Sequence, residues 1–134
     1  MRILVIDDYK SHGESLVELL KTLGHEGLYA QSFTDAQWLL DLFRFDVAIL
    51  DFDMPAVSGP EAAQDLASRF PEMQAVIVSA HTPEGDRLTC LGELPFLPKP
   101  VVHDTLRELL EEFARARLGS VLIRRTGFPM IKYE

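Results

Sequence analysis

Two carboxylates end an apolar run in the segment AILDFDMPAVSG, which spans residues 48–59. The run is typical of a buried strand, yet it stops at Asp51, and Asp53 follows closely. A loop acid or a helix cap is the simplest explanation for either residue alone. A carboxylate at the end of a buried strand is also suited to act as a nucleophile or as a metal ligand. The rest of the chain decides between these interpretations.

Other polar residues stand at equivalent places along the chain. Asp7 and Asp8 end the first apolar run, Ser79 ends the fourth, and Lys99 directly follows the fifth. In an open parallel sheet the carboxyl ends of the strands lie along one edge, and ligands bind there. We therefore expect these side chains to share one site with Asp51.

Such a site needs a compensating positive charge. Two unit charges 4 Å apart repel by about 4 kcal/mol at an effective dielectric constant near 20, and Lys99 alone leaves the three aspartates net negative. A small set of carboxylates that offers oxygen ligands alone is suited to Mg²⁺, because this ion keeps several of its waters. Zinc is not expected, because no cysteine joins the cluster and the histidines are peripheral to it.

The composition indicates one soluble globular domain. The chain has 134 residues, of which 47% are hydrophobic and 25% are charged. The single cysteine excludes an internal disulfide, and no apolar run approaches the length of a membrane span. We expect a cytoplasmic protein without membrane association. The net charge of −8 argues against direct nucleic-acid binding.

Short apolar runs alternate with helical stripes along the whole chain. Strands are expected at 2–7, 27–30, 46–50, 74–79 and 94–98. The helix after the second strand is expected to have Thr34 or Asp35 as its N-cap and to carry the apolar residues Trp38, Leu39, Leu42 and Phe43. Alternation of this kind predicts βαβ units, and hence an α/β fold with a parallel sheet and helices on both of its faces.

Two elements depart from this regular pattern. The segment that should hold the fourth helix contains Pro83, Gly85 and Gly92, which leave room for about two turns. The fifth strand contains Pro95 and Pro98, three residues apart, so one of them must face the neighbouring strand without an N–H to donate. We expect a shortened or irregular fourth helix and a short fifth strand at the edge of the sheet.

Together these residues resemble the receiver domain of two-component response regulators. The resemblance covers residues 1 to about 117 and rests on the order and spacing of Asp7-Asp8, Asp51, Met54-Pro55, Gly59, Ser79-Ala80, Phe96 and Lys99-Pro100. It implies a flavodoxin-like, doubly wound five-stranded parallel sheet with the strand order 2-1-3-4-5. We take residues 1–118 as the domain and residues 119–134 as a C-terminal tail or the start of a linker.

The resemblance implies a phosphoacceptor and a metal site. Asp51 would accept a phosphoryl group from a histidine kinase or a phosphotransfer protein and become an acyl phosphate. Asp7, Asp8, Asp51 and the main-chain carbonyl of Asp53 would hold the Mg²⁺. Such a domain is a signalling module and not an enzyme in the ordinary sense, since it catalyses only transfer to, and hydrolysis from, its own aspartate.

The resemblance also implies a switch that other proteins read. Lys99 would pair with the phosphoryl oxygens, Ser79 would donate a hydrogen bond to them, and Phe96 would turn inward. The changed surface would bind a downstream protein or an output domain, and a homodimer stays open. The positions of His81 and Asp53 help to set the phosphoryl lifetime in this family.

Two alternatives belong to other classes. The segment LDFDMP also resembles the signature of haloacid-dehalogenase-type phosphatases, with Asp51 as nucleophile and Asp53 as general acid, but that scheme gives Asp7 and Asp8 no function. The second alternative is a receiver-like protein-binding module that does not switch by phosphorylation. The shortened fourth-helix region favours it.

The tail lies outside the receiver pattern. It is locally basic, with Arg124, Arg125 and Lys132 on an acidic protein, and it is rich in apolar residues. We expect a flexible end or the beginning of a linker. The sharper hypothesis is a docking or dimerisation arm, because many apolar side chains would otherwise be left in water.

Overall fold

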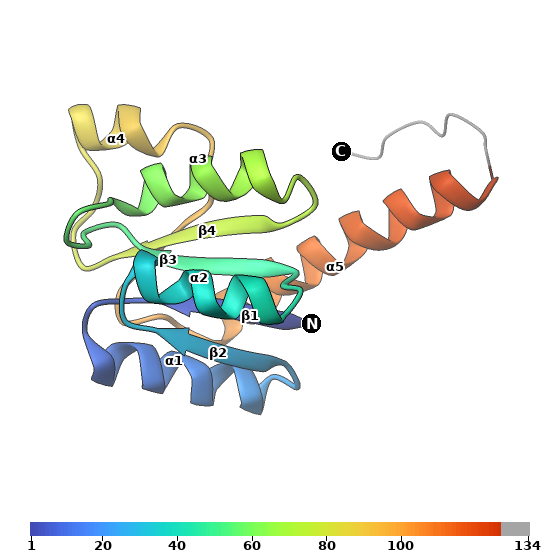
Figure 1. The fold of residues 1–134 in the computed structure, drawn as a ribbon, viewed down its shortest axis with the longest axis horizontal. Coiled ribbons are helices and arrows are strands. Elements are labelled where there is room, and N and C mark those ends of the chain that lie inside the picture. The colour runs from blue at the N-terminus through green and yellow to red at the C-terminus, as the bar shows by residue number, and fades with distance from the viewer. Residues whose placement is uncertain (127–134) are drawn as a thin grey trace.

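The computed structural model describes the backbone of residues 1–126 and the side chains of residues 1–117. Strands and helices alternate in the order β1 (Arg2–Ile6), α1 (Lys10–Thr22), β2 (Glu26–Ala30), α2 (Phe33–Leu42), β3 (Val47–Asp51), α3 (Gly59–Arg69), β4 (Gln74–Ser79), α4 (Asp86–Leu91), β5 (Phe96–Pro98) and α5 (His103–Thr126). The strands form one parallel sheet in the order β2-β1-β3-β4-β5 (Figure 1). The expected α/β fold and its strand order are confirmed.

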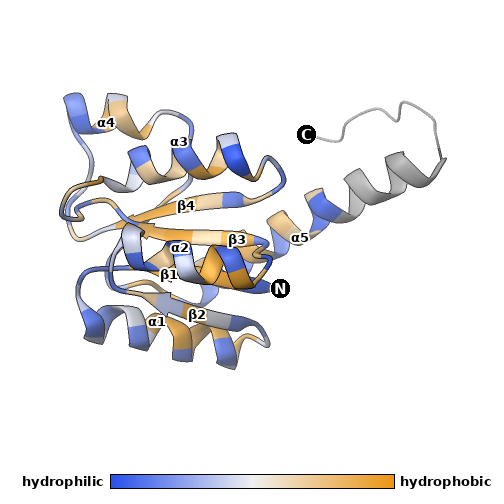
Figure 2. Ribbon diagram, in the orientation of Figure 1, coloured by the Kyte–Doolittle hydropathy of each residue, from blue (hydrophilic) through white to orange (hydrophobic). Residues whose placement is uncertain are grey.

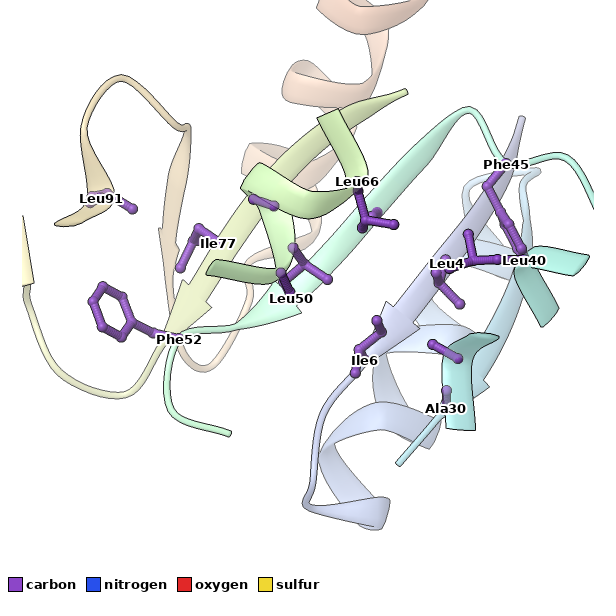
Figure 3. Close-up of a cluster of buried hydrophobic side chains, with 14 residues drawn as sticks. Leu4, Ile6, Ala30, Leu40, Phe45, Leu50, Phe52, Leu66, Ile77 and Leu91 are labelled. Carbon is purple, nitrogen blue, oxygen red and sulfur yellow. The ribbon is translucent and has the colours of Figure 1, made fainter. Parts of the chain in front are cut away.

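Two apolar clusters lie on opposite faces of the sheet, because successive side chains of a strand point to opposite sides. Leu4 and Ile6 of β1 join a cluster covered by α2, α3 and α4 (Figure 3). Ile3 and Val5 join a second cluster covered by α1 and α5. The helices carry both apolar and polar residues, whereas the central strands are apolar almost throughout (Figure 2). Burial on both faces explains the continuous apolar runs of the sequence.

The fourth helix is short, as the sequence predicts. α4 has six residues, of which only Leu91 is buried. Gly85 and Gly92 flank it with φ angles of +56° and +60°. Their ψ angles of −126° and −129° complete a backbone conformation that is open essentially to glycine alone. The two glycines therefore fix both ends of this helix.

The fifth strand is shorter than the segment 94–98 suggests, since β5 comprises Phe96–Pro98 only. The carbonyl of Pro95 accepts a hydrogen bond of 2.8 Å from the amide of Ile77 on β4. Pro95 thus faces β4, but it has no N–H to return, so the ladder begins one residue later. Pro98 falls at the intervening position, where its missing N–H points to the free edge of the sheet.

The start and the buried face of α2 differ from expectation. Ser32 is the N-cap, and its hydroxyl accepts a hydrogen bond of 3.0 Å from the amide of Asp35. The helix thereby begins before Thr34, and Ala36 and Leu40 face the core. Trp38, expected on the apolar face, is 74% exposed, and Leu42 is 65% exposed. Leu39, expected with them, does pack against the core. The buried face is thus centred on Ala36 and Leu40, and Trp38 lies away from it.

The last helix anchors the C-terminal end of the domain. Leu106 and Leu110 of α5 are fully buried, and Arg117 forms an ion pair with Asp46, the residue just before β3. The backbone of α5 continues without a break past residue 118, the expected end of the domain, to Thr126 (Figure 1). The tail residues 127–134 lie outside the described part of the chain. Among the residues that the structure describes, no helix is both long and apolar enough to cross a membrane.

Candidate phosphoryl-acceptor site

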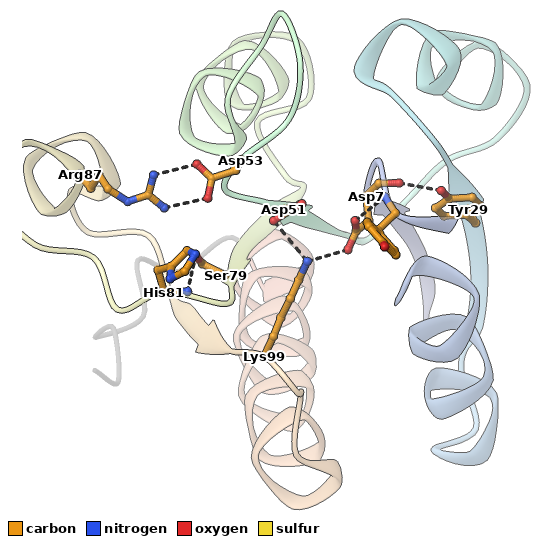
Figure 4. A network of polar contacts seen from close by, with 9 residues as sticks. Asp7, Tyr29, Asp51, Asp53, Ser79, His81, Arg87 and Lys99 are labelled. Carbon is orange, nitrogen blue, oxygen red and sulfur yellow. Dashed lines mark hydrogen bonds and ion pairs between the residues drawn. The ribbon is translucent and has the colours of Figure 1, made fainter. Parts of the chain in front are cut away.

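The polar residues identified from the sequence meet at the carboxyl edge of the sheet. Asp51 is the last residue of β3, Ser79 is the last residue of β4, and Asp7 directly follows β1. Lys99 follows β5 and extends its side chain toward Asp7 and Asp51 (Figure 4). Parallel pairing of β1, β3, β4 and β5 places all four residues at the same edge.

Lys99 bridges two buried carboxylates. Its Nζ lies 2.9 Å from Oδ2 of Asp7 and 3.4 Å from Oδ1 of Asp51. The two aspartates are only 3% and 7% exposed. A buried charge is costly unless it is paired, so the ammonium offsets part of the cost of keeping both acids at this edge.

The acidic group remains short of positive charge. Carboxylate oxygens of Asp7, Asp8 and Asp51 all lie within 4.8 Å of one another, and Asp8 is exposed. Burial raises the pKa of Asp51 to about 6; the nearby Asp7 acts in the same direction, while Lys99 and the amide of Asp53 act against it. A raised pKa means that the site disfavours the ionised form. Three converging carboxylates with oxygen donors only fit a hard divalent cation such as Mg²⁺.

The turn that presents Asp7 and Asp8 is fixed from two sides. Oδ1 of Asp7 accepts a hydrogen bond of 2.9 Å from the amide of Tyr9. The main-chain carbonyl of Asp7 accepts one of 2.6 Å from the hydroxyl of Tyr29 (Figure 4). The Tyr29 ring fits only because residue 13 is glycine, since a Cβ there would lie 2.1 Å from it. The N-cap of α1 is Tyr9, without a capping side chain. Neither Asp7 nor Asp8 therefore caps this helix.

The loop after Asp51 returns closely to the strand end. A Cβ at Gly59 would lie 2.5 Å from the carbonyl oxygen of Asp51, so only glycine permits this approach. Ser58 caps α3 by accepting a hydrogen bond of 3.3 Å from the amide of Glu61, and Pro60 stands in the first turn. The start of α3 thereby holds the backbone of Asp51 in place.

Ser79, His81 and Phe96 occupy the β4–β5 side of the site. Ser79 is 1% exposed, and its hydroxyl accepts a hydrogen bond of 3.1 Å from the amide of His81. His81 is exposed beside it. Phe96 is half-buried, and it packs against the cluster that includes Leu91 of α4. These three residues link the site to the α4–β5 surface.

The sequence did not reveal one further contact at the site. Arg87 of α4 binds the carboxylate of Asp53 through two hydrogen bonds, of 2.7 and 3.0 Å (Figure 4). Its guanidinium also lies 3.9 Å from the centre of the Phe52 ring. The hydrogen bonds and the charge of Arg87 hold the pKa of Asp53 below its usual value. The only signal was that Arg87 is the one Lys or Arg in residues 80–93.

A doubly wound sheet of this strand order, with carboxylates and a lysine converging at its carboxyl edge, defines a flavodoxin-like α/β domain with an acidic, cation-binding type of site. The sequence comparison is more specific. The chain belongs to the response regulator receiver domain family, which matches residues 3–111. It is therefore a signalling domain of two-component systems. Receiver domains bind Mg²⁺ at an aspartate cluster, and Asp7, Asp8 and Asp51 form such a group here.

Individual relatives agree with this assignment. A response regulator receiver protein of Anaeromyxobacter sp. (strain Fw109-5) is 32% identical over 111 residues, which are 81% of this chain and 46% of the relative. A receiver domain protein of Clostridium thermocellum superimposes with a TM-score of 0.76 at 28% identity, over 87% of this chain and 97% of that one.

A further solved structure is that of TrrA from Thermotoga maritima, in complex with Mg²⁺ and BeF. It superimposes with a TM-score of 0.73 at 27% identity, over 84% of this chain and 97% of that one. The present chain spans about half the length of the curated relatives that it matches first. The similarity thus concerns the receiver portion of longer proteins.

Proposed function

We propose that this chain accepts a phosphoryl group on Asp51 from a histidine kinase or a phosphotransfer protein, in a Mg²⁺-dependent reaction. The observation that supports this most directly is the convergence of Asp51, Asp7 and Lys99, with the ammonium 3.4 Å from the first carboxylate and 2.9 Å from the second. Family membership supports the same function, as does the complex of the related TrrA with Mg²⁺ and BeF.

In the proposed transfer, a carboxylate oxygen of Asp51 attacks the phosphorus of the donor. The P–N bond of a phosphohistidine, or the P–O bond of a small phosphodonor, breaks, and the leaving group keeps the electron pair. The new O–P bond makes an acyl phosphate. Only the ionised carboxylate attacks; without a metal the pKa of Asp51 is raised to about 6, and bound Mg²⁺ would favour the ionised form.

The remaining site residues would bind and orient the reacting groups. Asp7, Asp8, Asp51 and the carbonyl of Asp53 would hold Mg²⁺, which when bound offsets charge that develops on the transferring oxygens. Lys99 would move its contact from the carboxylate of Asp51 to a phosphoryl oxygen. The hydrogen bonds from Tyr9 and Tyr29 keep Asp7 oriented toward the other acids.

We also propose that phosphorylation changes the surface that a protein partner reads. The acyl phosphate brings new acceptor oxygens, to which the buried Ser79 hydroxyl can donate. Phe96 would then move inward from its half-buried position, and it would do so by packing alone, since it has no hydroxyl to bond. The partner is a downstream protein or an output domain.

The test is intact mass after incubation with a small phosphodonor, with and without Mg²⁺. We expect the wild-type chain to gain one phosphoryl group only with Mg²⁺, and Asp51→Asn to gain none. A gain that persists in Asp51→Asn would place the acceptor elsewhere. Turnover of an added phosphate ester would instead indicate the phosphatase alternative, which the family assignment does not support.

A specific observation favours a second candidate function, a protein-binding module that does not switch. α4, part of the surface where receivers report phosphorylation, has six residues. If the chain gains no phosphoryl group under any of these conditions, the non-switching binding module replaces the phosphoryl acceptor as the proposed function.

His81 offers a separate test of the phosphoryl lifetime. It is exposed at the mouth of the site, two residues after Ser79. We expect His81→Ala to change the decay constant of the acyl phosphate by about twofold or more, measured as loss of the mass increment over time. The control is His12→Ala, since His12 is an exposed residue of α1. An unchanged decay in His81→Ala would reject this assignment.

A further inference from the structure

α4 is held to the rest of the domain at few points. Among its six residues only Leu91 is buried, and Leu88 is 56% exposed. Gly85 and Gly92 flank the helix in conformations that glycine adopts without strain, so each can serve as a hinge. A short helix between two glycines moves as one piece when its remaining contacts change.

Arg87 provides the contact between this helix and the phosphoacceptor loop. Its guanidinium binds both carboxylate oxygens of Asp53 and lies 3.9 Å from the centre of the Phe52 ring. Both partners directly follow Asp51 in the chain. Exposed ion pairs are weak in general, but a bidentate pair stacked on an aromatic ring has a defined geometry. The two side chains are 37% and 55% exposed, so the pair can also rearrange.

Arg87 also interacts with the charge of the phosphoacceptor, although its contact is with Asp53. The hydrogen bonds that Arg87 donates to Asp53, and the charges of Asp53 and Asp51, raise the pKa of Arg87. An acyl phosphate carries more negative charge than the carboxylate that it replaces. It would repel the Asp53 carboxylate and attract the Arg87 guanidinium more strongly. The cation, and the helix that bears it, would be held closer to the site.

We propose that Arg87 is a positioning residue that couples the hinged helix α4 to the charge on Asp51. The proposal rests on the phosphorylation of Asp51 proposed above and adds a residue that the family pattern does not require. Before phosphorylation Arg87 pairs with Asp53 and stacks on Phe52. After phosphorylation it is drawn toward the phosphoryl group, and α4 becomes more tightly ordered.

Amide hydrogen exchange read by mass spectrometry tests the coupling. The amides of Thr89, Gly92 and Leu94 make the local hydrogen bonds that report order in this segment. In the full chain with Mg²⁺ and a small phosphodonor, we expect exchange in the peptide covering 85–94 to slow by about threefold or more on loading. In Arg87→Gln we expect faster exchange before loading and little change after it.

Arg69→Gln is a matched control. Arg69 also pairs with a carboxylate, Asp65 at 2.9 Å, and lies 5.2 Å from the Phe70 ring, but it belongs to α3 and is remote from the site. We expect its exchange to respond to loading as in the wild type. Arg87→Lys keeps the charge without the two-pronged contact, so it should restore part of the response.

The intact mass of each sample shows whether it is phosphorylated, and so distinguishes failure of the coupling from failure of the proposed function. If wild type and Arg87→Gln are both loaded and show equal protection of 85–94, the coupling is wrong and the proposed function stands. If neither is loaded, the proposed function fails and the coupling fails with it. A urea midpoint for Arg87→Gln close to that of the wild type would show that the fold itself is intact.

Discussion

At the scale of single residues, opposing influences act on Asp51. Burial and the neighbouring Asp7 disfavour its ionised form, whereas Lys99 favours that form, and the balance raises the pKa to about 6. A carboxyl whose pKa is higher in the folded than in the unfolded chain stabilises the fold only while it is protonated. That contribution is complete below about pH 4 and is lost as the pH rises through about 6.

Asp51→Asn should therefore stabilise the Mg²⁺-free protein at neutral pH. Asparagine keeps the shape but removes the buried charge, so we expect a gain of about 1–3 kcal/mol in unfolding free energy at pH 7.5 and almost none at pH 4. Urea denaturation at both pH values measures the difference. Asp41→Asn, at an exposed site on α2, is the control and should show no such dependence. An equal gain at both pH values would contradict the prediction.

The sequence was informative about some site residues and silent about others. Asp7, Asp51 and Ser79 stand at the ends of apolar runs, and parallel topology alone brings such ends together. Arg87 and Tyr29 bind partners 34 and 22 residues away, from the side of a helix and from within a strand. No local pattern records which side chain of an element reaches across to another, so these two contacts appear only in three dimensions.

At the scale of elements, β2 supports the metal-binding turn through Tyr29. We expect Tyr29→Phe to lower stability by about 1 kcal/mol, because the Asp7 carbonyl loses its hydrogen bond, and to weaken Mg²⁺ binding about tenfold. The concentration of Mg²⁺ that gives half-maximal phosphorylation measures the second effect, and the rate at saturating Mg²⁺ should change little.

Tyr9→Phe is the matched control for this prediction. Tyr9 belongs to the same turn, but its ring is 64% exposed and stacks on His12, so loss of its hydroxyl should leave both quantities unchanged. If the two variants need the same Mg²⁺ concentration, Tyr29 does not position the acidic pair.

A second prediction about the elements concerns the junction of β3 and α3. Gly59→Ala places a methyl group 2.5 Å from the Asp51 carbonyl oxygen, so the backbone must shift, at a cost of about 1–3 kcal/mol. Phosphorylation should slow as well, because the acceptor moves with the strand end. Gly24→Ala is the comparison: it meets no atom within 4 Å and is strained only through its φ of +88°. It should lose stability without slowing phosphorylation at saturating Mg²⁺.

Helix faces were less predictable than breaks in structure. The ends of β5 and α4 are set by the backbone geometry of Pro95, Gly85 and Gly92. Proline and glycine can be recognised in the sequence without knowledge of the tertiary contacts. The buried face of α2 depends instead on how closely the helix approaches the sheet. Ala36 permits a close approach, so Trp38 is left outside despite its size.

At the scale of the whole molecule, α5 joins the last part of the chain to the core. Its inner face is buried at Leu106 and Leu110, and Arg117 pairs with Asp46 near the beginning of β3. The described contacts of this helix therefore extend to the end of the matched family region and slightly beyond it.

A chain that ends after residue 118 should keep this fold. We expect its unfolding free energy to lie within about 0.5 kcal/mol of the full chain, with phosphorylation unchanged. A chain that ends after residue 112 lacks Phe113 and Arg117, so its unfolding free energy should fall several times further below that of the full chain. Urea denaturation compares the three, and light scattering on the first two tests whether the tail acts as a dimerisation arm. A large loss on ending at 118 would place the domain boundary further along.

The prolines around β5 have a consequence outside signalling. An exposed strand at the edge of a sheet can pair with a strand of another molecule, which is a common start of aggregation. Here that edge is three residues long, and Pro98 has no amide hydrogen to offer on its outer side. The β5 edge is therefore a poor template for a strand of a second molecule. The same prolines that shorten the ladder make sheet-to-sheet pairing at this edge unfavourable.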